Sequence, residues 1–393
     1  MFFKRPSFGD EAYRQRVARR RRIEFFWQAL VVVLVIAFVW AVAHNINESL
    51  TAHGIRSGFG FLTDRSSFEI GESVIPVTSN DPFYMMFLAG FLNTIKVAAV
   101  SVITATLLGL VVAVMRLSQY KVIRFLGTAH VEVYRNIPLL IQLFAIYLVI
   151  TEFLPDIFEP VKIGNWLLIS KSGFFIACPE HFWLVTLFSA AAGLAFGAFA
   201  CRQSLKNTTY EVAMLRATLA FFTAFAAAWI LSACVTGWSM PRPEGFWVEG
   251  GLSMTPEFIT LWTGLTLFTS ASIAEIIRAG ILTVGKKQWQ AGMALGMKNS
   301  QILTNIILPQ SLKLVIPPLA SQYMNLTKNS SLAVIIGYPD IVSVGNTSIV
   351  IMGQALEAIV IIMSVYLLIN LLTALLMSYI NGRVTRTSVR RVA

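Results

Sequence analysis

The sequence predicts an all-α, polytopic membrane protein with about eight transmembrane helices. Three properties of the 393-residue chain predict this class: 56% of the residues are hydrophobic, only 13% are charged, and the mean hydropathy is +0.69. A typical water-soluble protein has about 25% charged residues. The composition therefore places the chain in a bilayer.

Eight apolar stretches approach or exceed the roughly 20 residues that a helix needs to span a bilayer. They lie at 25–43, 84–115, 131–151, 182–200, 212–236, 258–278, 301–324 and 351–380. The sequence Asn80-Asp81-Pro82 predicts the start of the second span, because a capping side chain before a proline is typical of a helix N-terminus. The first stretch is longer than the apolar core of a signal peptide, so we expect a retained anchor although Ala41-Val42-Ala43 resembles a cleavage site.

The distribution of basic residues predicts the orientation. With a cytosolic N-terminus, the inside segments hold 20 Lys and Arg and 4 acidic residues, whereas the outside segments hold 6 and 13. Lys and Arg concentrate in cytosolic segments of membrane proteins, so both termini are expected in the cytosol. The run Arg19–Arg22 is then a topology anchor near anionic lipid, and nucleic acid is not an expected partner.

The chain divides into four parts. Residues 1–24 are a basic cytosolic tail, 25–81 contain the first span and an outside loop, 82–380 form the main transmembrane domain, and 381–393 are a second cytosolic tail. The spans within 182–236 are rich in Ala and Phe and nearly free of polar motifs. We therefore expect them, with the first span, to be peripheral to a core of five helices.

Two Glu-x-x-Arg pairs lie at the predicted cytosolic ends of two core spans. Glu132 and Arg135 form one pair, and Glu275 and Arg278 form the other. Residues three apart share a helix face, and ionisable groups at membrane depth face a partner or a water-filled cavity. We expect the two pairs to face each other, either as a gate or hinge lock or as a static ion-pair network.

Several other polar residues lie within or beside the core spans. Asn93, Lys96 and Gln142 either line a polar path or, for the two amides, join neighbouring helices by hydrogen bonds. Pro317-Pro318 is expected to break the seventh span, and 325–340 to be a re-entrant or interfacial segment. Lys328 either contacts a substrate carboxylate there or extends its ammonium group to the interface.

The sequence predicts no cofactor, metal site or enzymatic activity. The three Cys and four His residues are scattered, without the spacing of a disulfide framework or a zinc site. There is no GxxxxGK[ST] nucleotide-binding loop, and no nucleophile–base set stands out. The chain is thus expected to bind no ATP by itself.

A patterned polar segment separates the sixth and seventh spans. It lies at about 284–300 and continues into the sequence QAGMALGMKNSQILTNIILPQ. The patterned residues are Gln290, Ala291, Gly292, Gly296, Ile306, Leu308 and Pro309. We expect Gly292 and Gly296 to form a small-residue helix face for close docking, and Pro309 to begin the seventh span.

This segment resembles the permease signature of bacterial ATP-binding-cassette (ABC) importers, written Glu-Ala-Ala, three residues, Gly, nine residues, Ile-x-Leu-Pro. Gln290 replaces the Glu and Gly292 the second Ala, so docking is expected to depend on shape more than on that charge. FLAGFLNTIKVA, VEVYRNIPLLIQLF, TSASIAEIIRAG and the stretch 308–337 are similar to the polar amino acid branch. The extra spans and long outside loops look like the general L-amino acid subtype.

The resemblance implies a five-helix type I importer core in the bacterial inner membrane and uptake of L-amino acids. It also implies a second permease subunit (identical or different), ATPase subunits that receive the 290–309 loop, and a periplasmic amino-acid-binding protein. Two alternatives come from other classes. An ion-gradient-driven amino acid transporter would tend to show inverted repeats and acids at the midplane, and a channel-like subunit would not need a patterned cytosolic loop.

Overall fold

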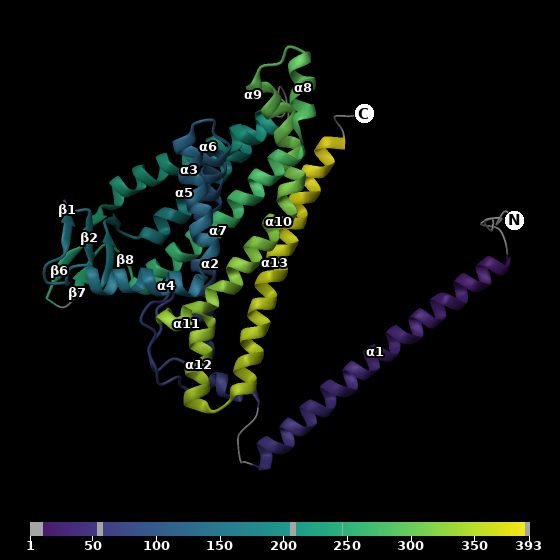
Figure 1. Ribbon diagram of the computed structural model, residues 1–393. Coiled ribbons are helices and arrows are strands. Elements are labelled where there is room, and N and C mark those ends of the chain that lie inside the picture. The colour runs from purple at the N-terminus through teal and green to yellow at the C-terminus, as the bar shows by residue number, and fades with distance from the viewer. Residues whose placement is uncertain (1–10, 53–57, 205–209, 246, 390–393) are drawn as a thin grey trace.

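The computed structural model describes residues 11–52, 58–204, 210–245 and 247–389, and most of them are helical. Six helices are long and apolar enough to cross a membrane, and the count rises to eight if two bent helix pairs are each one span. This range contains the predicted number. Figure 1 shows the bundle, with helix α1 (Glu11–Ala52) standing apart from it.

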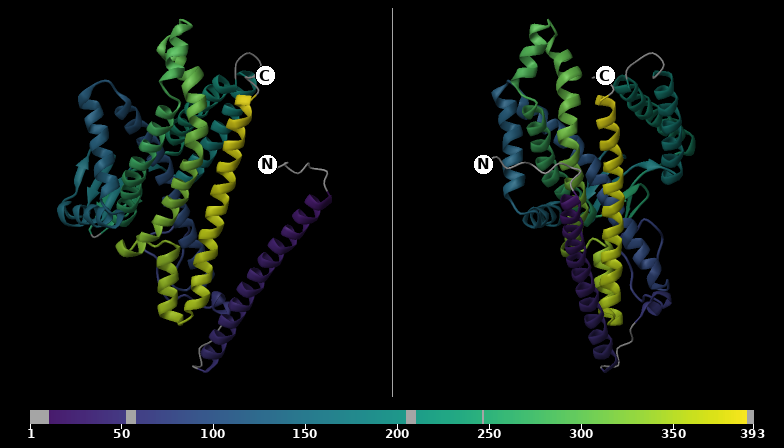
Figure 2. Two further views of the ribbon diagram at one scale, coloured as in Figure 1. Left: turned by 45° about the vertical axis from the view of Figure 1, so that its right-hand side comes forward. Right: turned by 90° about the vertical axis from the view of Figure 1, so that its right-hand side faces the viewer.

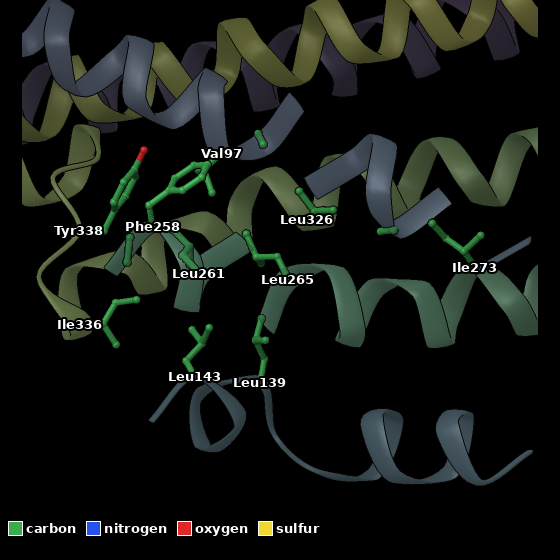
Figure 3. Close-up of a cluster of buried hydrophobic side chains, with 13 residues drawn as sticks. Val97, Leu139, Leu143, Phe258, Leu261, Leu265, Ile273, Leu326, Ile336 and Tyr338 are labelled. Carbon is green, nitrogen blue, oxygen red and sulfur yellow. The ribbon is translucent and has the colours of Figure 1, made fainter. Parts of the chain in front are cut away.

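Helices α2 (Phe83–Leu117) and α7 (Pro256–Thr283) are the centre of the bundle, and their bounds confirm two predicted spans. They approach closely because α2 carries Gly109, where a Cβ atom would lie 2.7 Å from Cγ2 of Ile273. Figure 3 shows the main buried cluster, in which Leu261 and Leu265 of α7 lie near Leu143. The close approach at Gly109 and this buried cluster together hold α2 and α7 in the middle of the bundle.

The third predicted span is not one straight helix. Helix α3 (Lys121–Asn136) and α4 (Leu139–Leu148) meet at an angle of 104°, and a π-helical turn (Val149–Phe153) follows α4. The break lies at Ile137 and Pro138, which are both extended. A proline disfavours helical geometry at the preceding residue, so Pro138 explains the break.

The segment after α7 begins with two short helices, α8 (Lys286–Ala294) and α9 (Asn299–Ile302), and a π-helical turn (Leu303–Ile307) then leads into α10 (Leu308–Asn329). The expected break at Pro317-Pro318 is wrong, because both prolines lie inside α10. Their fixed φ is compatible with a helix, which here continues without two amide donors.

The predicted re-entrant segment at 325–340 is mostly helical. Helix α10 extends to Asn329, and a 3-10 turn (Ser330–Leu332) and α11 (Ala333–Ile336) follow. Gly337, with φ of 82°, ends α11, and α12 (Ile341–Met352) packs against α2. Helix α13 (Ala355–Val389) then runs back along α10, as Figures 1 and 2 show.

Helices α5 (Phe182–Ser204) and α6 (Tyr210–Thr236) pack against each other. The chain segments around them contain strands that the sequence analysis did not predict: β1 (Val161–Ile163), β2 (Leu167–Ser170), β3 (Gly173–Ile176), β4 (Cys178–Pro179), β5 (Trp238–Ser239), β6 (Arg242–Glu244), β7 (Trp247–Glu249) and β8 (Leu252–Met254). Strands β1, β2, β3 and β8 form an antiparallel sheet in that order, and the remaining strands form two antiparallel pairs, β4 with β5 and β6 with β7.

Candidate functional site

Helices α8 and α9 project beyond one end of the bundle (Figure 1). The turn between them is set by Gly296, whose φ is 71°. The amide of Gly296 donates to the carbonyl of Met293 at 2.9 Å, and the amide of Met297 donates to the carbonyl of Gly292 at 3.1 Å. These two bonds define a Schellman motif, in which a left-handed glycine ends a helix.

The expected small-residue face of Gly292 and Gly296 is therefore wrong. Gly296 lies past the end of α8, and a Cβ atom there would meet no atom within 4 Å. Gly292 is buried, and its Cβ would lie 2.7 Å from Cγ1 of Ile302. Gly292 thus allows α9 to pack on α8 within this chain, and Gly296 supplies the turn.

The exposed surface of this segment carries large apolar side chains among polar ones. Met293 is 53% exposed and Leu295 79% exposed, and Gln290 and Ala291 are also exposed. The segment follows α7 after Val284 and Gly285 only and continues into α10 through the π-helical turn. Exposed apolar side chains that gather on a projection are typical of an interaction site.

The remaining patterned residues lie at the base of this projection. Ile306 is half-buried in the π-helical turn, Leu308 is the first residue of α10, and Pro309 follows it. A proline within a continuous helix displaces the carbonyl four residues earlier, here that of Asn305. The π-helical turn contains Asn305, so Pro309 accounts for this local widening.

A charged cluster lies at the same end of α2 and α7. Glu275 accepts from Arg116 through one carboxylate oxygen and from Arg278 at 3.1 Å through the other. The side chain of Arg116 is 10% exposed and that of Glu275 31%. This cluster ties the end of α2 to the last turns of α7, directly before α8.

The structure does not bring the two predicted Glu-x-x-Arg pairs together. Glu132 is exposed and accepts from Asn136 on its own helix at 3.1 Å, and Arg135 is exposed. Glu275 has Arg116 as its partner from another helix instead. The expectation of a layer built from the two pairs is therefore wrong, because α3 packs against α7 through Val131 and leaves Glu132 and Arg135 on its exposed side.

Gln142 stabilises the bend between α3 and α4. Its side-chain amide donates to the carbonyls of Tyr134 at 2.9 Å and Ile137 at 2.7 Å. The carbonyl groups freed by the break thereby receive hydrogen bonds, which is needed where water is excluded.

Lys328 is exposed in the last turn of α10, where a cation interacts favourably with the helix dipole.

A second charged cluster lies towards the other end of α2 and α7. Lys96 of α2 forms an ion pair with Glu72, and the hydroxyl group of Thr255 donates to the other carboxylate oxygen of Glu72. Thr255 also caps α7 by accepting from the amide of Phe258 at 3.2 Å. Asn93 donates to the carbonyl of Glu72 at 2.7 Å.

The two clusters are equally spaced on both central helices. Lys96 and Arg116 are 20 residues apart in sequence, as are Thr255 and Glu275. This separation corresponds to about 30 Å along a helix, which is close to the thickness of the hydrocarbon core. The two helices therefore run in the same direction between two charged layers.

Hydroxyl groups join the helices between these layers. Thr104 of α2 contacts the Thr266 hydroxyl at 2.7 Å and accepts from the Trp262 indole at 3.1 Å. Thr106 contacts the Tyr323 hydroxyl at 3.0 Å. Such interhelical bonds hold the core together inside a membrane.

Sequence reasoning missed three residues of the charged layers: Arg116, Glu72 and Thr255. The equal spacing along the two spans is the signal that points to Arg116, but Glu72 lies in a loop whose path only the structure shows.

Among the described residues, no group of three or more His, Cys, Asp or Glu side chains is arranged to hold a metal ion.

Comparisons with known proteins identify the family. Residues 105–386 match the family described as "Binding-protein-dependent transport system inner membrane component". The chain is 36% identical over 367 residues to the General L-amino acid transport system permease protein AapQ of Rhizobium johnstonii, with 91% of each chain covered. It is also 36% identical over 368 residues to the Putative amino-acid ABC transporter permease protein YhdX of Escherichia coli, with 92% of this chain and 93% of YhdX covered. The chain therefore belongs to the family of inner membrane components of binding-protein-dependent transport systems.

Proposed function

We propose that this chain is the permease subunit of an ABC importer for L-amino acids and that it receives its driving force through the α8–α9 segment. The observation that carries this proposal is the exposed apolar surface around Met293 and Leu295, on a projection joined to both α7 and α10. A separate ATPase subunit is the proposed partner of this surface. Gln290 is exposed there, and it stands where the family signature has a Glu.

The proposed direction of force follows from the connections of the segment. Helix α7 is capped by Thr255 at one end and carries Glu275 near the other, and only Val284 and Gly285 separate it from α8. Because α9, the π-helical turn and α10 form an unbroken helical path, movement of the projection displaces both core helices together. The ATPase would thereby change the packing of α7 and α10.

The proposed assembly lies in the bacterial inner membrane, with both termini in the cytosol. The excess of Lys and Arg in the segments on the α8 side supports this orientation. A second permease subunit, identical or different, would complete the pathway, and a periplasmic amino-acid-binding protein would deliver the substrate. The names of the AapQ and YhdX relatives support amino acids as the substrate class.

Reconstitution of the complete transporter in proteoliposomes tests this function. Uptake of radiolabelled L-amino acids is expected to require internal ATP, the loaded binding protein and an ATPase subunit able to hydrolyse ATP. A hydrolysis-deficient ATPase subunit is the matched control. Uptake by this chain alone, driven by an imposed proton or sodium gradient, would instead support a secondary transporter and contradict the proposal.

A further inference from the structure

The segment 64–82 crosses the end of the bundle opposite to α8, and we call it the strap. Its two ends are held together by backbone hydrogen bonds, from Ser66 to Asp81 at 2.9 Å and from Ser67 to Ser79 at 3.0 Å. Its middle carries Glu72. The strap thus presents one carboxylate to the helices beneath it.

The Glu72 carboxylate is held by two different helices. Lys96 of α2 pairs with one oxygen, and Thr255, the cap of α7, donates to the other. The Glu72 side chain is 11% exposed and that of Lys96 26%. Asn93 fixes the strap backbone by donating to the carbonyl of Glu72 and by accepting from the amide of Val74 at 3.2 Å.

The surroundings of Lys96 stabilise its positive charge and favour an anionic partner. Its ammonium group lies 4.4 Å from the centre of the Phe258 ring, which favours a cation. Within the described part of the chain, Glu72 is its one ion-pair partner. A partly buried ammonium group is unfavourable without an anion, so a state in which the strap moves away is stabilised by another anion at Lys96, such as a carboxylate.

A cavity adjoins this ion pair. It has a volume of 370 Å³ and is lined in part by Glu69, Glu72, Thr255, Glu257 and, from α12, Thr347. Small-molecule sites have volumes of roughly 300–1,000 Å³. The hydroxyl group of Tyr147 donates to Glu257 at 3.2 Å and orients its carboxylate. Carboxylates thus line the cavity, and one of them, Glu72, is the ion-pair partner of Lys96.

We propose that Lys96 and Thr255 bind the α-carboxylate of the transported amino acid and that Glu72 occupies this position when no substrate is present. The α-ammonium group would face Glu69 and Glu257. The strap then competes with the substrate for this site. When the substrate binds, its carboxylate replaces that of Glu72 at Lys96 on α2 and at Thr255, the cap of α7. This inference depends on the proposed amino acid transport.

The two partners of the ion pair are expected to differ in their mutational effects. Lys96→Gln removes a charged hydrogen bond to the substrate and is expected to lower uptake about tenfold or more. Glu72→Gln removes the competing carboxylate but also leaves Lys96 unpaired in the empty site, so it is expected to lower the melting temperature of the substrate-free protein. Its uptake is expected to fall less than that of Lys96→Gln, because the substrate carboxylate restores the pair. Uptake is measured in proteoliposomes with the complete transporter, saturating loaded binding protein and radiolabelled L-amino acids. A static ion pair predicts equal losses, and that result would overturn the proposal.

The charge-swapped double variant, Glu72→Lys with Lys96→Glu, separates binding from stability. It restores an ion pair between the strap and α2, so its melting temperature is expected to return towards the wild-type value, while uptake stays about tenfold or more below it. Recovery of uptake together with stability would overturn the proposal. If wild-type protein shows no ATP-driven uptake, the proposed function itself fails; wild-type uptake with symmetric variant effects refutes only the carboxylate exchange.

Movement of the strap is tested by cross-linking. Glu72→Cys and Thr255→Cys are combined in a chain whose three native cysteines are replaced by serine. A disulfide between the two positions is expected to abolish uptake, and reduction to restore it to the level of the Thr255→Cys single variant, which itself lacks one hydrogen bond to the substrate. The two single-cysteine chains, treated in the same way, are the controls. Undiminished uptake by the cross-linked protein would show that the strap does not need to move.

Discussion

Gly296 provides a sharp test of how the α8–α9 segment is built. Glycine is required either by a docking contact that admits no larger side chain or by a helix end with positive φ. The first cause predicts that tolerance of a substitution falls with side-chain volume, and the second that it depends on how readily the new residue adopts positive φ. The structure supports the second cause, because φ is 71° and a Cβ atom would meet nothing within 4 Å in this chain. Backbone conformation, not side-chain volume, should therefore decide which substitutions are tolerated.

The expected magnitudes follow from the left-handed conformation. An L-residue other than Asn or Asp costs about 1–2 kcal/mol there, and 1.4 kcal/mol corresponds to about a tenfold change in population. Gly296→Ala should therefore reduce the population of the native turn, relative to other conformations of this segment, several-fold. Gly296→Val should reduce this population further, because β-branched residues rarely adopt positive φ. Gly296→Asn should remain close to the wild type.

The assay is amino-acid-stimulated ATP hydrolysis and uptake by the complete transporter in proteoliposomes, compared at equal amounts of assembled complex. The expected order of activity is Gly, Asn, Ala, Val. Asn and Val have similar size, so their separation isolates backbone conformation. If activity instead falls with side-chain volume, so that Ala exceeds Asn, a close-packed partner and not the helix end sets the requirement.

Three further substitutions test contacts of the core, each by the melting temperature of the purified protein in detergent. Arg116→Ala leaves Glu275 without its interhelical partner and should lower the free energy of unfolding by about 2 kcal/mol. This is less than the 3–5 kcal/mol of a fully buried pair, because Glu275 is partly exposed. An unchanged melting temperature would contradict this. Gly280→Ala places a Cβ atom 2.3 Å from Cγ2 of Val315 and should cost about 1–3 kcal/mol through overpacking; a stabilised protein would show that α7 and α10 separate freely. Gln142→Leu leaves two carbonyls at the α3–α4 bend without a donor and should cost about 1–3 kcal/mol; no loss would mean that the bend does not depend on this amide.

The long central helices were predictable from sequence. The predicted spans 84–115 and 258–278 correspond to Phe83–Leu117 and Pro256–Thr283, because uninterrupted apolar residues specify such helices directly. The start of α2 was also predicted, although the reason was incomplete: no side chain caps this helix, and Asp81 accepts from Thr78 instead.

The effect of each proline on its helix was predicted less well from the sequence. Pro138 breaks a predicted span, whereas the pair Pro317-Pro318 does not. Sequence alone shows which donors are missing but not whether neighbouring groups satisfy the freed carbonyls, as Gln142 does at the first site. The outcome at each proline is therefore a property of the tertiary structure.

The partners of charged residues were predicted least well. The i,i+3 contact of Glu275 with Arg278 follows from helix geometry, and it is present. The contacts of Glu275 with Arg116 and of Lys96 with Glu72 join residues that are 159 and 24 positions apart. No local pattern encodes such pairs, and they depend on how α2, α7 and the strap are arranged.

The contact between the α8–α9 segment and an ATPase subunit is tested most directly by site-specific photo-cross-linking. A photoreactive amino acid at Leu295, which is 79% exposed beyond the bundle, is compared with one at Val350, which is 84% exposed on α12 at the other end. In the assembled transporter, Leu295 should give an adduct with the ATPase subunit and Val350 should give none. An ATPase adduct from Val350, or none from Leu295, would contradict the proposed coupling surface.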